Sequence, residues 1–279
     1  LEQPVGEWLP GLAGSDKAGI TIRQLLTHRS GLPAHRLFYM TLKSLAPQVR
    51  KAAVLDLLKQ TPLACRPGQT TVYSDLGFML LCRVVEAAAG SSLDRIVKEH
   101  IYGPMGLDDL FFVDLAGGQR FDGSFAATEL CPVRNRLLCG EVHDDNAWFV
   151  GGVDGHAGLF GTAEAVFRLL RRLVVDCRGD AAASFFSKRV LSEVFHGTAA
   201  RPLPLGFDRP ALQGSSAGRH FSANTIGHLG FTGVSFWMDL DKDACVILLT
   251  NRVHPTRWNA GLTRFRPRIH DRIMEHFEI

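Results

Sequence analysis

Four short segments of the chain contain the side chains whose types and spacing could carry out chemistry. One places Tyr73 directly before Ser74 and Asp75, and another places His228 two residues before Gly230. A third contains Ser30, and the fourth, in two pieces, is rich in imidazole and carboxylate groups. The segments cover residues 25–32, 73–77, 142–147 with 155–160, and 228–233.

The imidazole and carboxylate groups of the fourth segment permit two interpretations. His143, Asp144, Asp145 and His156 are residue types that bind metal ions well. Their spacing matches no standard metal-binding template, so we favour a loop held together by side-chain hydrogen bonds over a metal-dependent hydrolase. Asn146 and His156 are also candidates to line a substrate cleft.

In this order and at these distances, the four segments resemble the class C β-lactamase superfamily, which also includes D-alanyl carboxypeptidases and penicillin-binding-protein-like esterases. The resemblance extends over nearly the whole chain, and residues 142–160 are similar to the branch known simply as serine hydrolases. It implies two-step hydrolysis through an acyl-serine, with esters, peptidyl-D-amino-acid amides or β-lactams as substrates. It implies no cofactor.

The resemblance assigns a catalytic role to Tyr73, as a phenolate or proton relay beside the nucleophile. A free phenol has a pKa of about 10, so this role requires nearby cations. Asp75 stands where the family usually has Asn. An amide both donates and accepts hydrogen bonds, whereas a carboxylate only accepts, so Asp75 is expected either to pair with a lysine or to cap the following helix. The alternative for Tyr73 is an ordinary half-buried tyrosine at a helix entrance.

The resemblance also assigns roles to His228, Gly230 and Phe231. Gly230 lets substrate backbone approach closely, and the backbone N–H of Phe231 forms half of an oxyanion hole. The family has Lys or His at the position of His228. A neutral imidazole holds a carboxylate less firmly than a lysine does, which argues against a dedicated β-lactamase. The alternative is a loop histidine without a catalytic role.

The family nucleophile is the serine of a Ser-x-x-Lys motif, and no serine lies three residues before any lysine of this chain. In relatives the motif precedes the segment that matches residues 25–32, so we expect it upstream of Leu1. Ser30 lacks a lysine at the required offset, and His28, Ser30 and Gly31 are expected to end a short helix. A non-catalytic protein that binds acylated or peptidoglycan-like ligands is the alternative function.

Local signals predict the elements that position these residues. Thr21 and Gln24 form a capping box, with Ile20 and Leu25 as its hydrophobic staple. Ser74 or Asp75 can cap a helix that Gly90 ends, and Thr162 can cap another. The predicted helices cover about 20–28, 47–60, 75–89, 93–101, from 162 onward and 188–196, and a strand hairpin covers 234–240 and 244–251.

We expect an α/β (α+β) fold with a mostly helical subdomain, residues 1–202, packed on an antiparallel sheet and a C-terminal helix, residues 203–279. The terminal helix is expected to cover the hairpin through Trp258, Leu262, Phe265 and Ile269, with Pro267 kinking or restarting it. The hydrolase interpretation requires that Tyr73 and His228 converge on one pocket.

Composition limits the remaining possibilities. A net charge of +3, from 31 basic and 28 acidic residues, without a basic stripe between aromatics, argues against nucleic-acid partners. The apolar runs are too short for a membrane helix. Six cysteines without a CxxC pair lean toward a reducing, cytoplasmic compartment without fixing the localisation. A small acyl or peptide substrate is the partner that we expect; the oligomeric state is not predicted.

Overall fold

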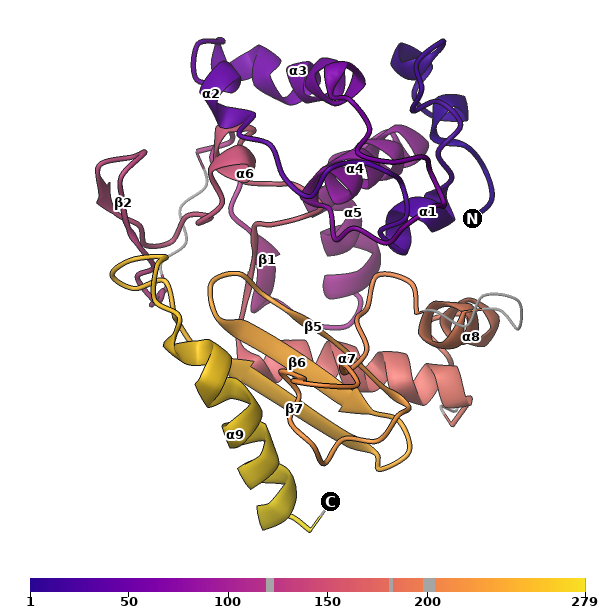
Figure 1. The fold of residues 1–279 in the computed structure, drawn as a ribbon, viewed down its shortest axis with the longest axis vertical. Coiled ribbons are helices and arrows are strands. Elements are labelled where there is room, and N and C mark those ends of the chain that lie inside the picture. Colours follow the sequence, from indigo (N-terminus) through magenta and orange to yellow (C-terminus); the bar gives the residue numbers. More distant parts are fainter. Residues whose placement is uncertain (119–122, 181–182, 198–203, 279) are drawn as a thin grey trace. The chain divides into compact units, whose positions relative to one another are not determined.

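The computed structural model describes residues 1–118, 123–180, 183–197 and 204–278 (Figure 1). The chain divides into two compact units. A helical unit comprises Leu1–Ser124 and Gly140–Phe160, and a sheet unit comprises Phe125–Cys139 and Gly161–Ile279. This division differs from the predicted boundary at residue 202, because helices before that residue pack on the sheet. Each unit is described by itself.

The helical unit surrounds a long apolar helix, α4. Its elements are η1 (Val5–Glu7), η2 (Pro10–Leu12), α1 (Ile22–Leu26), α2 (Tyr39–Leu42), α3 (Pro47–Gln60), α4 (Asp75–Ala89), α5 (Leu93–Val97), the π-helical η3 (Lys98–Tyr102), β1 (Leu110–Phe112) and α6 (Asp145–Phe149), while β4 (Leu159–Gly161), which pairs with β1, lies at the unit boundary. α4 packs against α1 and α3, and the core of the unit lies between them.

The sequence explains both ends of α4. Ser74 caps its first turn, and Gly90, in the left-handed conformation at φ 66°, ends it. Between them Leu76, Leu80 and Val84 are buried in the core cluster. The prediction of this helix and its cap is therefore confirmed.

The capping box of α1 is also confirmed. The Thr21 side chain accepts from the Gln24 N–H at 3.2 Å, and the Gln24 side chain accepts from the Thr21 N–H at 3.0 Å. After α1 the chain turns at His28, which has φ 53°, and at Gly31, which has φ 77°. A Cβ at Gly31 would overlap the carbonyl oxygen of Cys65, so this turn requires glycine.

The sheet unit is built on three antiparallel strands in the order β5-β6-β7. Its elements are β2 (Leu130–Cys131), β3 (Arg136–Leu137), α7 (Ala163–Arg178), α8 (Lys188–His196), β5 (Thr225–Leu229), β6 (Val234–Asp239), β7 (Ala244–Leu249) and α9 (Gly261–His276). β6 and β7 form the predicted hairpin, with Trp237 opposite Val246 and buried.

The apolar face of the sheet packs against α7 and α8. Leu170 and Val174 from α7 and Phe195 from α8 form one cluster with Ile226 and Met238 of the sheet. Thr162 caps α7 as predicted, accepting from the Ala165 N–H at 3.2 Å. These two helices therefore belong to the core of the sheet unit.

The predicted buried face of α9 is wrong. Trp258 and Phe265 are 86% and 50% exposed, and of the predicted stripe only Leu262 is buried. The buried side chains, spaced four residues apart, are Leu262, Arg266, His270 and Met274. Arg266 donates to the Val234 carbonyl at 3.3 Å, and an imidazole nitrogen of His270 bonds to the Ser216 carbonyl at 3.0 Å. Backbone carbonyls bind one nitrogen of each of these two side chains, which allows polar residues to be buried on this face, so the apolar periodicity pointed to the wrong one.

Within the described ranges, no single helix is long and apolar enough to cross a membrane. α4 and the segment from α5 to η3 pass this test only as a pair bent by 68°. None of the six cysteines forms a disulfide.

The corrected face of α9 can be tested by unfolding. Leu262→Ala removes a buried side chain and should lower the free energy of unfolding by roughly 2–4 kcal/mol. Phe265→Ala, the matched control three residues later, should cost only about 1 kcal/mol because half of the side chain is already exposed. Urea denaturation measures both, and a larger cost for Phe265→Ala would restore the predicted stripe.

Candidate active site

The first residues of α4 present two candidate side chains on one accessible side. The backbone at Ser74 is extended, with φ −137° and ψ 114°, so successive side chains alternate in direction. Ser74 is buried, whereas Tyr73 is 52% exposed and Asp75 is partly exposed. Tyr73 and Asp75 can therefore both meet a ligand, while Ser74 points into the protein.

Ser74 anchors the start of α4. Its hydroxyl donates to the Pro33 carbonyl at 2.7 Å and accepts from the Gly77 N–H at 3.1 Å. Its backbone N–H donates to Nδ1 of His28 at 3.0 Å. Two of these contacts are with the segment after α1 and one is within α4, so the backbone that carries Tyr73 is fixed from the buried side.

His28 positions the phenol of Tyr73 directly. The imidazole lies 4.5 Å from the Tyr73 ring and 5.0 Å from the Phe78 ring, measured between centroids. Its backbone carbonyl accepts from the Val72 N–H at 2.8 Å. Since Nδ1 accepts a hydrogen bond, a neutral His28 carries its proton on Nε2. The expected structural role of His28 thus includes holding Tyr73.

Asp75 pairs with a histidine that the sequence analysis missed. Its carboxylate lies 3.1 Å from Nδ1 of His35, and its backbone N–H donates to the Ala34 carbonyl at 2.9 Å. Ser74, not Asp75, supplies the side-chain cap of α4. The hydrogen bond to Asp75, which outweighs burial, raises the pKa of His35, and the charges of Asp75 and Asp144 add to it. This favours an imidazolium against a carboxylate.

Behind the start of α4, four side chains of alternating charge interact in series. Asp144 caps α6, accepting from the Ala147 N–H at 2.8 Å, and the same oxygen lies 2.9 Å from Nε2 of His156. The other imidazole nitrogen is 3.9 Å from Asp154, whose second oxygen is 3.1 Å from Arg83. This series of ion pairs thus joins α4 to α6 through the buried Asp154 and His156 and the partly buried Asp144.

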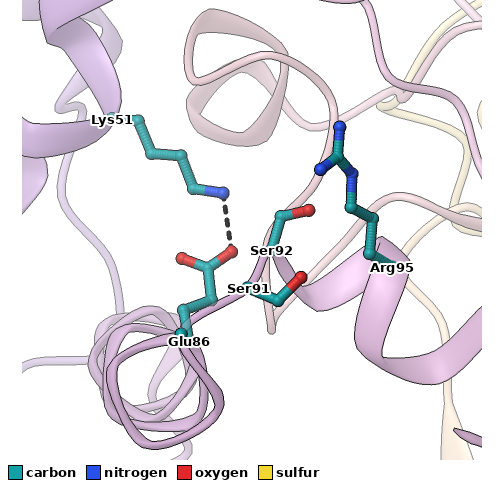
Figure 2. A pocket seen from close by; sticks show the side chains of 6 residues that line it. Lys51, Glu86, Ser91, Ser92 and Arg95 are labelled. Atoms are coloured by element: carbon teal, nitrogen blue, oxygen red, sulfur yellow. Dashed lines mark hydrogen bonds and ion pairs between the residues drawn. The ribbon is translucent and has the colours of Figure 1, made fainter. Parts of the chain in front are cut away.

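At its Arg83 end, this series of charged side chains continues to a surface hollow. Arg83 pairs with Glu86 at 3.1 Å, and Glu86 pairs with Lys51 of α3 at 2.6 Å. Figure 2 shows this last pair beside Ser91, Ser92 and Arg95, which line the hollow with it. Glu86 thus has two cationic partners, of which it shares Arg83 with Asp154.

The aspartates hold His156 as an imidazolium. Burial alone would lower the pKa of His156, but the hydrogen bond to Asp144 and the negative charges of Asp144 and Asp154 raise it to about 10. Burial would likewise raise the pKa of Asp144, yet His156 and the Ala147 N–H bring it to about 2. The His156 side chain is only 3% exposed. A group that stays charged at neutral pH and is buried in this way supports the structure and does not relay protons.

This arrangement agrees with the hydrogen-bonded interpretation of the fourth segment. His143 and Asp145, the other candidate ligands, are buried. Among the residues that the structure describes, no group of three His, Cys, Asp or Glu side chains is placed to hold a metal ion.

Asn146 fixes the backbone that follows His35. The side chain is 1% exposed; its Nδ2 donates to the Arg36 carbonyl at 2.8 Å, and its Oδ1 accepts from the Tyr39 N–H at 2.9 Å. Both ends of the amide are therefore occupied by backbone. Asn146, like His156, is therefore a buried residue that stabilises the segments next to the exposed candidate side chains.

The sheet unit carries His228 at the end of β5, before a tight turn. Nδ1 of His228 bonds to the Leu229 carbonyl at 2.8 Å. In the turn, the Gly230 N–H donates to the Val234 carbonyl at 2.8 Å, and a Cβ at Gly230 would overlap the Val234 side chain. Glycine is therefore needed to close the turn, apart from any role toward a substrate.

Phe231 projects from this turn and is 60% exposed. The Arg252 guanidinium lies 4.3 Å from the centre of its ring, and Arg252 Nε donates to its carbonyl at 2.7 Å. These contacts stiffen the segment after His228. Tyr73 and His228 lie in different units, and their convergence remains a prediction.

Comparison with known proteins identifies the family. The Beta-lactamase family model matches residues 1–266. The chain belongs to the β-lactamase family. A relative from Escherichia coli K12, named D-alanyl-D-alanine carboxypeptidase, is 30% identical over 275 residues, which are 90% of this chain and 62% of that protein. The chain thus spans less than two thirds of its relative's length.

Solved structures support the β-lactamase and transpeptidase-like fold. A β-lactamase from Mycobacterium bovis superimposes with a TM-score of 0.60 at 19% identity, covering 99% of this chain and 82% of the other. A penicillin-binding protein from Bacillus halodurans gives a TM-score of 0.65 at 17% identity, covering 95% and 76%. The expected fold class, mixed helices with an antiparallel sheet, is confirmed.

The charge on His156 predicts how stability depends on pH. Its pKa of about 10 in the folded chain exceeds the ordinary 6.5, so its stabilisation is complete below pH 6.5 and is lost as the pH rises through 10. His156→Gln leaves Asp144 without its cation and leaves Asp154 with Arg83 alone, and should cost roughly 3 kcal/mol at pH 6. The difference from wild type in urea unfolding should shrink between pH 6.5 and 10. A difference that is constant over this range would contradict the buried imidazolium.

Proposed function

We propose that the whole protein is a serine-type acyl hydrolase that acts through an acyl-enzyme, with Tyr73 as its general acid–base group. The observation that carries this proposal is an exposed phenol at the mouth of α4, held by His28 and by the buried Ser74, in a chain of the β-lactamase family. A solvent-accessible side chain on an immobilised backbone is what proton transfer in a transition state requires.

In the proposed mechanism, Tyr73 takes the proton of the nucleophilic serine as it attacks the substrate carbonyl, and later returns a proton to the leaving group. The serine belongs to a Ser-x-x-Lys motif that the 279 residues do not contain, so we place it in a segment outside them. The lysine of that motif would supply the cation that lowers the pKa of the phenol.

We assign the other half of the site to the turn after β5. His228 orients the substrate by hydrogen bonding, and the Phe231 N–H, with the N–H of the nucleophile, stabilises the oxyanion. The contacts of Arg252 with the ring and the carbonyl of Phe231 support this assignment, because oxyanion donors must be held in place before the reaction. Gly230 keeps the turn closed.

The proposed substrates are esters and peptidyl-D-amino-acid amides, with β-lactams as weaker candidates. The name of the Escherichia coli relative supports the peptidyl substrates. Asp75 and His228 depart from the Asn and Lys that would favour β-lactam binding. Small peptides or esters that need no strong carboxylate clamp fit these side chains better.

Tyr73→Phe in the full-length protein should lower turnover of a p-nitrophenyl ester by roughly 10²- to 10⁴-fold, because the phenol that transfers protons is lost. The matched control is Tyr102→Phe, since Tyr102 is buried in η3 and burial raises the pKa of its phenol to about 12. Steady-state kinetics measure both variants. Wild-type turnover of Tyr73→Phe would remove Tyr73 from the mechanism.

The 279-residue polypeptide alone should not hydrolyse nitrocefin or p-nitrophenyl esters, because it has no Ser-x-x-Lys pair. Ser30 does not replace it: the side chain is buried, and its hydroxyl accepts from the Leu32 N–H at 3.3 Å. Labelling with a fluorophosphonate followed by peptide mapping checks this. A label on Ser30 would contradict our assignment, and a full-length protein that binds such probes only reversibly would favour the non-catalytic alternative.

A further inference from the structure

The pair of His35 and Asp75 stands at the accessible side of the candidate site. Asp75 follows Tyr73 by two residues and lies on the same side of the chain. The His35 side chain is 41% exposed, and its Nδ1 is engaged by the carboxylate at 3.1 Å. In the described part of the chain, Nε2 of His35 has no hydrogen-bonding partner. The pair thus presents an accessible ring nitrogen that is anchored to Asp75, two residues after the exposed phenol.

We propose that His35, oriented by Asp75, is a substrate-binding residue whose Nε2–H donates to an acceptor oxygen on the acyl part of the substrate. The proposal rests on the hydrolase function proposed above. The substrates that it favours carry a second carbonyl or a carboxylate besides the bond that is cleaved, as N-acylamino acid esters and peptides do. Esters of simple fatty acids lack that oxygen.

The charges around His35 keep this donor available. Asp75 faces it from α4, Asp144 from the start of α6, and His156 from the following loop. Arg36, its chain neighbour, donates to the His35 carbonyl at 3.0 Å and so holds the backbone. The two carboxylates favour the imidazolium and His156 opposes it, with a net rise in the pKa of His35. In the imidazolium both ring nitrogens donate.

Loss of the proton would reverse the role of Nε2. The neutral ring keeps its hydrogen on Nδ1, against Asp75, and Nε2 then only accepts. The donor therefore exists below the pKa of His35 and disappears above it. Asp75→Asn removes the carboxylate that stabilises the imidazolium, but its amide can itself donate to the substrate oxygen.

The experiment uses the full-length protein and two esters, p-nitrophenyl N-acetylglycinate and p-nitrophenyl acetate. Only the first carries the second carbonyl. His35→Ala should lower kcat/KM for the first ester by roughly 10- to 100-fold, the size expected for a hydrogen bond from a charged donor, and leave the second nearly unchanged. His100→Ala, which removes an exposed histidine of η3, is the matched control and should affect neither ester.

Asp75→Asn supplies the rescue. If His35 acts as a donor, the double variant His35→Ala with Asp75→Asn should recover most of the lost preference for the N-acetylglycinate. The preference of the wild-type protein should fall as the pH rises through the pKa of His35, whereas that of Asp75→Asn should not follow this titration. A merely structural role of His35 predicts neither the rescue nor the pH dependence.

NMR titration of the His35 ring tests the pair without turnover. Its pKa should lie above 6.5 and fall in Asp75→Asn. Equal losses for both esters in His35→Ala, or no rescue by Asp75→Asn, would overturn the donor role while leaving the hydrolase function intact. Absence of turnover and of covalent labelling in the full-length protein would overturn the hydrolase function and this inference with it.

Discussion

The ion pair between Asp144 and His156 is the constraint on which the candidate site depends. Taking an imidazolium and two carboxylates out of water is costly, and the cost is recovered only when the groups bind one another. Asp144 meets this condition while capping α6, and Asp154 meets it through Arg83 of α4. The loop that carries Asp154 and His156 is thereby connected to α4 and α6 through the buried imidazolium of His156.

The ion pair between Asp144 and His156 positions the exposed side chains indirectly, through a series of contacts. α6 carries Asn146, and the Asn146 amide fixes the backbone on both sides of Leu37 and Phe38. His35 precedes that segment and meets Asp75 at the start of α4. On the other side of the same helix start, Ser74 and His28 hold Tyr73. Each accessible side chain is thus backed by a buried one, which limits its conformational freedom before any substrate binds.

Local signals were sufficient to predict much of the fold. The capping box at Thr21, the cap at Ser74 and the hairpin of β6 and β7 depend on residues close together in the chain, and all three are confirmed. The buried face of α9 could not be predicted, because Arg266 and His270 are buried by bonding to carbonyls from distant segments. The same limit hid His35, which lies outside any regular element and meets Asp75 only through the fold. The resemblance led to Tyr73 and His228. The structural roles of Asn146 and His156 could be recognised only once the structure showed which groups they bind.

The interleaved course of the chain has a consequence for folding. The chain passes from the helical unit to the sheet unit at residue 125, returns at 140 and leaves again at 161. The helical unit therefore cannot close its network of charges until residues 140–160 have been synthesised, since Asp144, Asp154 and His156 come from that returning stretch. Contacts of this range slow folding and leave α4, with its apolar surface, waiting for its last partners. Until Asp154 has been synthesised, Arg83 has only Glu86, one turn along the same helix, as a carboxylate partner, so α4 carries a charged pair beside its apolar side chains before the returning stretch arrives.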